Sequence, residues 1–421
     1  MVVWVFVLNM KLIFDISLPG EQFNAQKWQT GLFRYADTLL GHLHAADDLT
    51  VYHSNTVSAL TVKDARKYLS QKYRRLTLAN KPAYPLPRKV FGKGVRTINR
   101  LYHLMNIDID RLIYDEEVFA RADIFHTPYN KISDEVKKYT NLSRVITIHD
   151  LIPIILPNHL QKGLIQETIQ SVGNDYVICV SHNTRNDLLN YAPHINPDHV
   201  FVSHLAADPE IFYPCSDRLK FQAIQKKHNL PERYFLSLAT LEPRKNLDHL
   251  IRCFLKFIRE QHINDLYLVL AGAKGWEYDH IFSAVKQAGS LRKRIIFTGR
   301  IPDEDLAVVY SNANSFYFMS EYEGFGLPPL EAMQCGVPVV TSDVSSLPEV
   351  VGDGGIMLPP RDEDALCDTM YRLYKDQELR EYFKKKALAR ARSFSWDKCV
   401  KEHMDIYKTI FPGPERNPHS A

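Results

Sequence analysis

The sequence has few cysteines, and they are not arranged as a disulfide framework or a zinc module requires. Six cysteines are scattered over 421 residues, with no CxxC pair and no tight His/Cys cluster. Disulfide scaffolds and zinc modules both need closely spaced residues of this kind. The pattern fits a reducing compartment, so we expect a cytoplasmic protein.

Charge of one sign and long hydrophobic runs are also lacking. The chain has 52 Lys and Arg against 49 Asp and Glu, and a net charge of +3 does not indicate a nucleic-acid binder. Residues 1–8 (MVVWVFVL) are too few for a membrane-spanning helix, which needs about 20 apolar residues. They also lack the basic start and the cleavage site of a signal peptide. We therefore expect a soluble protein whose native start is Met1 or Met10.

Glycine and proline, at 18 and 23 residues, are not frequent enough to indicate a fibrous or disordered chain. Instead, short apolar runs alternate with helical patterns, as in parallel sheets covered by helices on both faces. The predicted strands cover residues 11–17, 49–53, 123–127, 145–149, 176–180, 234–239, 266–271, 295–298, 315–319, 337–341 and 355–358. Two such series predict an α/β protein with two doubly wound, Rossmann-like domains.

The boundary between the two series falls near residues 206–218, where prolines interrupt a stretch without a clear period. We predict an N-terminal domain over residues 10–207, a C-terminal domain over 208–400, and a C-terminal helix with a loose tail over 401–421. Doubly wound sheets bind ligands at the carboxyl ends of their strands. The crevice between the domains is therefore the expected site.

The most informative segment is residues 321–338 (EYEGFGLPPLEAMQCGVP), directly after a predicted strand. Gly324 and Gly326 precede a helix that begins at the double proline. Such glycines let backbone amides approach a ligand, and the helix dipole favours negative charge there. Glu323 in the loop and Glu331 in the first turns of the helix can both point at one ligand. A tight turn with a first-turn glutamate explains these residues equally well.

A second segment, residues 240–246 (TLEPRKN), follows the strand at 234–239. Arg244 and Lys245 lie at the mouth of the sheet, close to the next helix, which Asn246 can cap. Two cations together with helix amides suit a diphosphate group. A solvated Arg-Lys pair is the simpler interpretation of this segment taken alone.

A third segment, residues 147–151 (TIHDL), ends the strand at 145–149. His149 closes that strand at the edge of the crevice, where it can donate to a sugar hydroxyl or carry a proton. The alternative is a structural histidine, with Asp150 capping the turn that follows. His126, after the preceding strand, has the same two interpretations and a weaker case for function.

These three segments in this order resemble glycosyltransferase family 4, the retaining nucleotide-sugar transferases of the GT-B fold. The resemblance covers nearly the whole chain and is strongest over residues 235–360. It includes FTGRIPDEDLAVVYSNA, the E-x7-E element from Glu323 to Glu331, and SSLPEVVGDGG. TGLFRYADTLL resembles the family's glycine loop, at Gly31, and its first helix. The implied fold is GT-B: two Rossmann-like domains facing across a cleft, with a C-terminal helical tail.

The resemblance implies a substrate-binding role for several residues. Glu331 would bond the donor ribose, and the amides of Gly324, Phe325 and Gly326 would hold sugar hydroxyls and phosphate. Gly31 would belong to the same site from the N-terminal domain. Many family members carry an arginine where this chain has Thr240, and we expect Arg244 to replace it.

The resemblance also implies the catalytic residues, which are Glu323, His149 and Lys245. Glu323 would stabilise the developing sugar cation, and His149 would contact the sugar. Lys245 would neutralise the diphosphate as the nucleotide leaves, which lowers the barrier where charge develops. No Asp-x-Asp triplet follows a predicted strand, so we expect neither a metal nor another cofactor.

The implied function is a hexosyltransferase of surface-polysaccharide biosynthesis that retains configuration. The first expectation is mannose from GDP-mannose, transferred to a glycan or a polyprenyl-diphosphate-linked acceptor. A UDP-sugar-dependent hexosyl- or N-acetylhexosaminyltransferase is the nearest alternative. Alternatives of another class are a GT-B-fold sugar-nucleotide epimerase and an inactive nucleotide-sugar-binding module. A dinucleotide oxidoreductase would need a GxGxxG after a strand, and the sequence has none.

Residues 63–100 contain 12 Lys and Arg against one acid, Asp64, interleaved with aromatic and aliphatic residues. Such a stretch can lie on an anionic bilayer. We therefore expect peripheral association with the inner face of the membrane and a lipid-linked acceptor. A solvated surface with a proline-rich loop is an equal alternative, and no nucleic-acid motif accompanies the charge.

Overall fold

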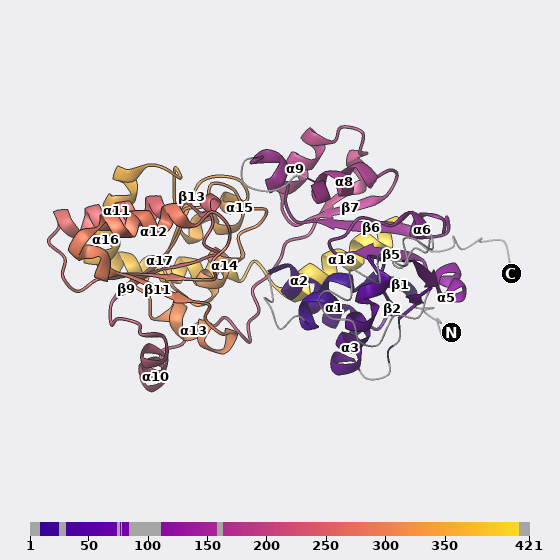
Figure 1. Cartoon of the computed structure of the whole chain (residues 1–421), viewed down its shortest axis with the longest axis horizontal. Helices are drawn as coiled ribbons and strands as arrows, with labels where there is room; N and C mark the ends of the chain where they lie inside the picture. The colour runs from indigo at the N-terminus through magenta and orange to yellow at the C-terminus, as the bar shows by residue number, and fades with distance from the viewer. Residues whose placement is uncertain are drawn as a thin grey trace, which may run out of the picture.

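The computed structural model describes residues 9–24, 31–73, 76, 78–83, 111–157 and 163–411. Two six-stranded sheets, in which all strand pairs are parallel, organise this part of the chain (Figure 1). The first has the order β2-β1-β5-β6-β7-β8 and the second the order β11-β10-β9-β12-β13-β14. The predicted α/β class with two doubly wound, Rossmann-like domains is confirmed.

The strands of the first sheet are β1 (Met10–Asp15), β2 (Leu49–Ser54), β5 (Ile124–Thr127), β6 (Ser143–Ile148), β7 (Tyr176–Cys179) and β8 (Val200–Val202). Those of the second are β9 (Tyr234–Leu238), β10 (Tyr267–Ala271), β11 (Ile295–Gly299), β12 (Ser315–Phe318), β13 (Val339–Ser342) and β14 (Ile356–Leu358). A small antiparallel pair joins β3 (Asn80–Pro82) to β4 (Leu112–Tyr114). Every predicted strand is present, whereas β3, β4 and β8 were not predicted. Each of these three has only three residues, too few for a recognisable pattern.

Helices connect the strands. In the first half they are α1 (Ser17–Asn24), α2 (Gly31–His44), α3 (Val62–Lys72), α5 (Glu116–Arg121), α6 (Asp134–Lys137), α7 (Ile152–Ile155), α8 (Gly163–Ser171) and α9 (His182–Tyr191). In the second half they are α10 (Arg218–His228), α11 (Leu247–Glu260), α12 (Asp279–Gln287), α13 (Asp303–Ser311), α14 (Leu327–Gln334), α15 (Leu347–Val351), α16 (Glu363–Lys375), α17 (Gln377–Ala391) and α18 (Trp396–Ile410).

Both faces of the second sheet are buried, which explains why its strands are continuously apolar. Alternate residues of a strand point to opposite faces. Leu236 and Phe316 accordingly pack with α10, α13, α14 and α17. Their neighbours Phe235 and Tyr317 pack with α11, α12 and α16.

The C-terminal helix α18 returns to the first half of the chain and packs against α2 (Figure 1). The Tyr407 hydroxyl lies 2.6 Å from His126 Nδ1, and Ser143 Oγ donates to the Ile410 carbonyl at 3.2 Å. The helix expected over 401–421 therefore begins earlier, at Trp396. Residues 412–421, where a loose tail was expected, lie outside the described residues.

Within the described residues, no helix is both long enough and apolar enough to cross a membrane. Residues 1–8, which contain the first of the two start candidates, are outside this part of the chain. So are residues 74–75, 77 and 84–100, which carry much of the basic segment expected to contact lipid. The described part of that segment is α3 with the short strand β3.

Candidate active site

Two of the three predicted segments meet because β9 and β12 are neighbours in the second sheet. The loop after β9 contains Arg244 and Lys245, and the loop after β12 contains Glu323. The Arg244 carbonyl accepts hydrogen bonds from the Glu321 amide at 2.9 Å and the Ser320 hydroxyl at 3.2 Å. These bonds hold the two loops together at the carboxyl end of the sheet, where ligands of such folds bind.

Glu323 is the centre of a buried charge cluster. Its Oε1 lies 2.5 Å from Lys245 Nζ and 2.8 Å from Arg244 Nη1. Burial by itself would raise the pKa of Glu323, but the two cations outweigh it and lower the pKa to about 2. The Glu323 carboxylate is therefore ionised throughout the physiological pH range.

The two cations of the cluster have different surroundings. Lys245 Nζ lies 4.9 Å from the centre of the Phe318 ring, and burial followed by the charge of Arg244 lowers the pKa of this lysine. Arg244 also donates to Glu242 Oε1 at 2.6 Å and to the Tyr322 carbonyl at 2.5 Å. Arg244 therefore links the loop after β9 to the loop after β12, whereas Lys245 forms an ion pair with Glu323.

Asn246 occupies the N-cap position of α11 in a left-handed conformation, with φ 54°. Its side chain does not cap the helix as predicted. Instead, Asn246 Nδ2 donates to the Pro360 carbonyl at 2.7 Å. The left-handed turn directs the chain from Lys245 into α11.

The loop of Gly324 and Gly326, before α14, contacts the N-terminal half of the chain. A Cβ atom on Gly324 would lie 1.9 Å from the His149 carbonyl oxygen, so no other residue fits there without a shift. Ser181 Oγ and Thr184 Oγ1 donate to the Gly324 carbonyl at 2.7 Å and 3.1 Å. Gly326, with φ 121°, then starts α14.

Ser345 and Ser346, directly before α15, hold the same loop through hydrogen bonds. The Glu323 amide donates to Ser345 Oγ at 2.9 Å. The Ser346 hydroxyl lies within hydrogen-bond distance of the carbonyls of Glu323, at 3.0 Å, and Phe325, at 2.6 Å. The side chain of Phe325 is buried, with its ring near His204 and Phe394. The loop is therefore fixed on both sides.

His149 lies where the sequence predicted, directly after β6 and beside the loop of Gly324. Its Nε2 is 2.8 Å from the Pro128 carbonyl, so that nitrogen donates and Nδ1 is left as the acceptor. Burial lowers the pKa of His149 to about 4, which keeps the ring neutral near pH 7. Asp150 Oδ1 accepts from the Ile152 amide at 3.0 Å, which confirms the predicted cap.

His126 is a structural residue, as its weaker case suggested. It is fully buried, with Nε2 2.8 Å from Thr147 Oγ1 and Nδ1 2.6 Å from the Tyr407 hydroxyl. Both nitrogens therefore face internal partners.

Glu331 on α14 faces α2 of the other half. Its Oε2 accepts from the Tyr310 hydroxyl at 3.0 Å, and its Oε1 lies 3.5 Å from Arg34 Nη1. Arg34 also contacts Asp303 at 2.5 Å. A Cβ on Gly31, one turn before Arg34, would lie 3.3 Å from Leu327. Sequence reasoning missed Arg34, although it lies in the quoted segment TGLFRYADTLL.

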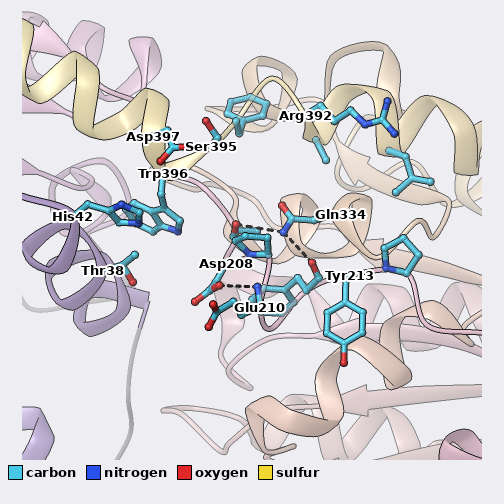
Figure 2. A pocket seen from close by; sticks show the side chains of 17 residues that line it. Thr38, His42, Asp208, Glu210, Tyr213, Gln334, Arg392, Ser395, Trp396 and Asp397 are labelled. Atoms are coloured by element: carbon cyan, nitrogen blue, oxygen red, sulfur yellow. Dashed lines mark hydrogen bonds between the residues drawn. The ribbon is translucent and has the colours of Figure 1, made fainter. Parts of the chain in front are cut away.

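Two cavities lie between the two halves near α2, and Glu331 lines one of them. The smaller, of about 160 Å³, is lined by Arg34, Asp303 and Glu331 among others. The larger, of about 810 Å³, lies farther along between α2, residues 207–214 and the start of α18 (Figure 2). Trp396 lines both. Of the predicted site residues, Glu331 lines the smaller cavity and the others line neither of these two.

Comparison with known proteins identifies relatives of this chain. Residues 220–390 match the family model described as glycosyl transferases group 1. O-antigen chain mannosyltransferase B of Escherichia coli is 34% identical over 274 residues, covering 63% of this chain and 70% of that protein. The serotype-specific mannosyltransferase WbdA of the same organism is 30% identical over 259 residues, which are 60% of this chain. The aligned part is 32% of WbdA, so this chain matches about a third of it.

Solved structures share the fold at low sequence identity. Sucrose-phosphate synthase of Thermosynechococcus elongatus has a TM-score of 0.67 at 21% identity, covering 96% of this chain and 99% of that one. Anabaena Alr3699/HepE in complex with UDP and glucose has a TM-score of 0.67 at 14% identity, covering 95% and 100%. This chain is therefore a group 1 glycosyltransferase with the GT-B fold, in a family that includes the O-antigen mannosyltransferases.

Proposed function

We propose that the chain transfers a hexose from a nucleotide sugar to a glycan or a polyprenyl-diphosphate-linked acceptor, with retention of configuration, in surface-polysaccharide biosynthesis. The observation that carries the proposal is the contact between Lys245 and Glu323 at the carboxyl ends of β9 and β12. Gly324, the residue after Glu323, packs directly against the His149 carbonyl. A cation for a diphosphate and an ionised carboxylate for a sugar thus share one site.

Lys245 is placed to stabilise the leaving nucleotide. As the bond to the sugar breaks, negative charge develops on the diphosphate, and a buried ammonium group is effective there because little water screens it. Glu323 holds Lys245 in position and faces the sugar as it gains positive charge. The low pKa of Glu323 keeps that carboxylate ionised for this role.

Retention of configuration requires the acceptor to attack the sugar from the same face that the nucleotide leaves. We propose that an oxygen of the leaving phosphate takes the acceptor proton, so that no protein base is needed. The neutral His149 ring then orients a sugar hydroxyl through Nδ1. The diphosphate charge is met by Lys245, by amides of Gly324, Phe325 and Gly326, and by the dipole of α14, without a metal.

Mannose from GDP-mannose is the donor we propose first, because both curated relatives described above are named mannosyltransferases. The second candidate is a UDP-sugar, supported by the HepE structures with UDP and UDP-glucose. Glu331 is the proposed ribose ligand with either base. Because Lys245, Glu323 and Glu331 are all present, we favour sugar transfer over the two alternative functions, an inactive binding module and an epimerase.

The proposal is tested by incubating the full chain with GDP-, UDP- and dTDP-sugars without added divalent metal and measuring nucleotide release and thermal stabilisation. A bound donor at a hundredfold excess over Kd stabilises the native state by about 2.7 kcal/mol. We expect the largest response to GDP-mannose, and NMR of the product should show the anomeric configuration of the donor. A response to NAD alone, or an inverted product, would contradict the proposal.

A further inference from the structure

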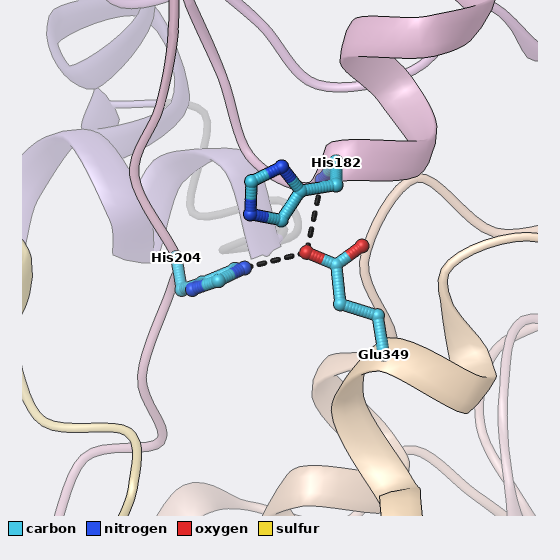
Figure 3. Close-up of side chains that lie close together, drawn as sticks. All are labelled: His182, His204 and Glu349. Carbon is cyan, nitrogen blue, oxygen red and sulfur yellow. Dashed lines mark hydrogen bonds and ion pairs between the residues drawn. The ribbon is translucent and has the colours of Figure 1, made fainter.

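Three side chains that can ligate a metal meet at the joint between the two halves of the molecule, away from Lys245 and Glu323. Figure 3 shows His182 at the start of α9, His204 in the segment after β8, and Glu349 on α15 of the C-terminal half. One potential ligand atom from each lies within 4.8 Å of the others. His204 Nε2 and Glu349 Oε1 are 2.5 Å apart.

Glu349 is already held in place by the N-terminal half. Its Oε1 accepts from the His182 amide at 2.9 Å, and its Oε2 accepts from the Asn183 amide at 3.3 Å. The carboxylate therefore sits at the N-terminus of α9, where the helix dipole favours negative charge. The ring of His182 lies next to the same carboxylate. Because His182 is the exposed member of the three residues, its ring is the one most able to rotate.

The donor set matches one class of ion. Two imidazoles and one carboxylate are the ligands of many zinc sites that leave a fourth position for water. Imidazole also suits Cu²⁺ and Ni²⁺, whereas Mg²⁺ and Ca²⁺ prefer oxygen ligands only. Ligand atoms of a tetrahedral zinc site lie about 3.3 Å apart, given bonds of about 2.0 Å. The three ligand atoms lie within 4.8 Å of one another, so side-chain rotation would have to bring them to that spacing.

We propose that His182, His204 and Glu349 bind a divalent transition metal of the zinc class, and that the ion clamps the N-terminal half, through His182 and His204, to α15 of the C-terminal half. Glu349 lies on the short helix whose preceding residues, Ser345 and Ser346, hold the loop of Glu323. A metal at this joint is therefore coupled mechanically to the candidate active site without touching it. This inference is independent of the proposed donor and acceptor.

Cobalt provides the first test, because tetrahedral Co²⁺ absorbs visible light and Zn²⁺ displaces it. We expect the metal-free full chain to bind one equivalent of Co²⁺ with visible absorption bands. His182→Ala and His204→Gln should each weaken binding by about tenfold or more. His182→Ala keeps the backbone amide that Glu349 accepts from, so the fold should persist. His194→Ala, which changes an exposed histidine of the same half, is the matched control and should bind like the wild type.

Small-angle X-ray scattering tests the clamp. When Zn²⁺ is added, the radius of gyration of the wild type should fall, or the range of conformations that fits its scattering should become narrower. The scattering of His182→Ala should not change. Absent cobalt bands, or binding that both histidine variants leave unchanged, would overturn the site. Binding without any change in scattering would overturn the clamp. Neither measurement uses a sugar nucleotide, so a wrong donor assignment cannot be mistaken for failure here.

Discussion

At the scale of single residues, the candidate site depends on charges that are buried but paired. An unpaired buried ion costs several kcal/mol, so each cation near Glu323 needs a counter-charge when no donor is bound. Glu323 supplies it for Lys245 and for Arg244 together. A donor diphosphate would bring new negative charge to Lys245, while Arg244 stays bound to Glu242 and Glu323.

Replacing Lys245 by alanine should separate catalysis from stability. We expect kcat to fall roughly 10²-fold or more, because the charge developing on the diphosphate loses its nearest cation. Thermal stability should change less, since Arg244 still pairs with Glu323. Steady-state kinetics and melting curves measure the two effects. Lys286→Ala, an exposed lysine on α12, is the control, and wild-type kinetics in both variants would contradict the assignment.

Arg34 should control the protonation of Glu331. Burial raises the pKa of Glu331, and the positive charge of Arg34 opposes that rise. Removing Arg34 raises the pKa further, so the carboxylate is neutralised at a higher pH as the solution is acidified. In the role we propose for Glu331, the ionised carboxylate accepts hydrogen bonds from the donor ribose. Arg34→Ala should therefore bind nucleoside diphosphate more weakly and lose binding at a higher pH than the wild type.

Calorimetric titration with the nucleotide over a pH series measures this shift. Arg34→Lys keeps the charge and should lie between Arg34→Ala and the wild type. Identical pH profiles for all three proteins would show that Arg34 does not act on Glu331.

Residue-level prediction from sequence succeeded where one sheet sets the geometry. Lys245 and Glu323 follow neighbouring strands, so the rule for strand ends brought them together. The contact of Arg34 with Glu331 and Asp303 joins two domains. No local pattern encodes such a pairing, because it depends on how the domains close.

At the scale of elements, the strands were predictable because most residues of each are apolar and helical patterns separate them. The three missed strands are shorter than any reliable period. The start of α18 was placed five residues too late, although Trp396, Cys399 and His403 are buried at the spacing of one helix face and this signal was available in the sequence.

The loop before α14 gives the prediction at this scale. Gly324→Ala would place a methyl group against the His149 carbonyl, which is part of the backbone and cannot rotate away. We expect this contact between the two halves to be disfavoured and kcat/KM to fall by roughly 10²-fold, because the contact sets the position of His149 relative to the loop of Glu323 and small misplacements of reacting groups are costly. Activity and the radius of gyration are the measurements. Gly173→Ala, which meets no atom within 4 Å, is the control. Full activity of Gly324→Ala would show that this contact is not needed.

At the scale of the whole molecule, α18 makes the two halves interdependent. The chain builds the first sheet, then the second, and returns to pack Tyr407 against His126. Folding of the N-terminal half is thus completed only by residues more than two hundred positions later. The sequence predicted a terminal helix but not its destination, because nothing local indicates which domain an amphipathic helix will cover.

Charge on α3 bears on where the whole molecule binds its acceptor. The helix buries Val62, Ala65, Tyr68 and Leu69 and exposes Lys63, Arg66 and Lys67 on its other side. Each cation near an anionic bilayer contributes about 1 kcal/mol. Replacing all three with glutamine keeps the helix propensity. It should weaken binding to anionic vesicles by about 100-fold, since about 3 kcal/mol is lost.

Vesicle flotation at two salt concentrations measures this binding. The wild type should float with anionic vesicles, and less so at high salt, because ions screen the attraction. Replacing three exposed lysines of the C-terminal half by glutamine (Lys286, Lys293 and Lys385) matches the charge change and should leave flotation intact. If neutral and anionic vesicles bound the chain equally, or both triple variants lost binding alike, the α3 face would not be the membrane contact. The proposed lipid-linked acceptor would then have to be reached by another surface.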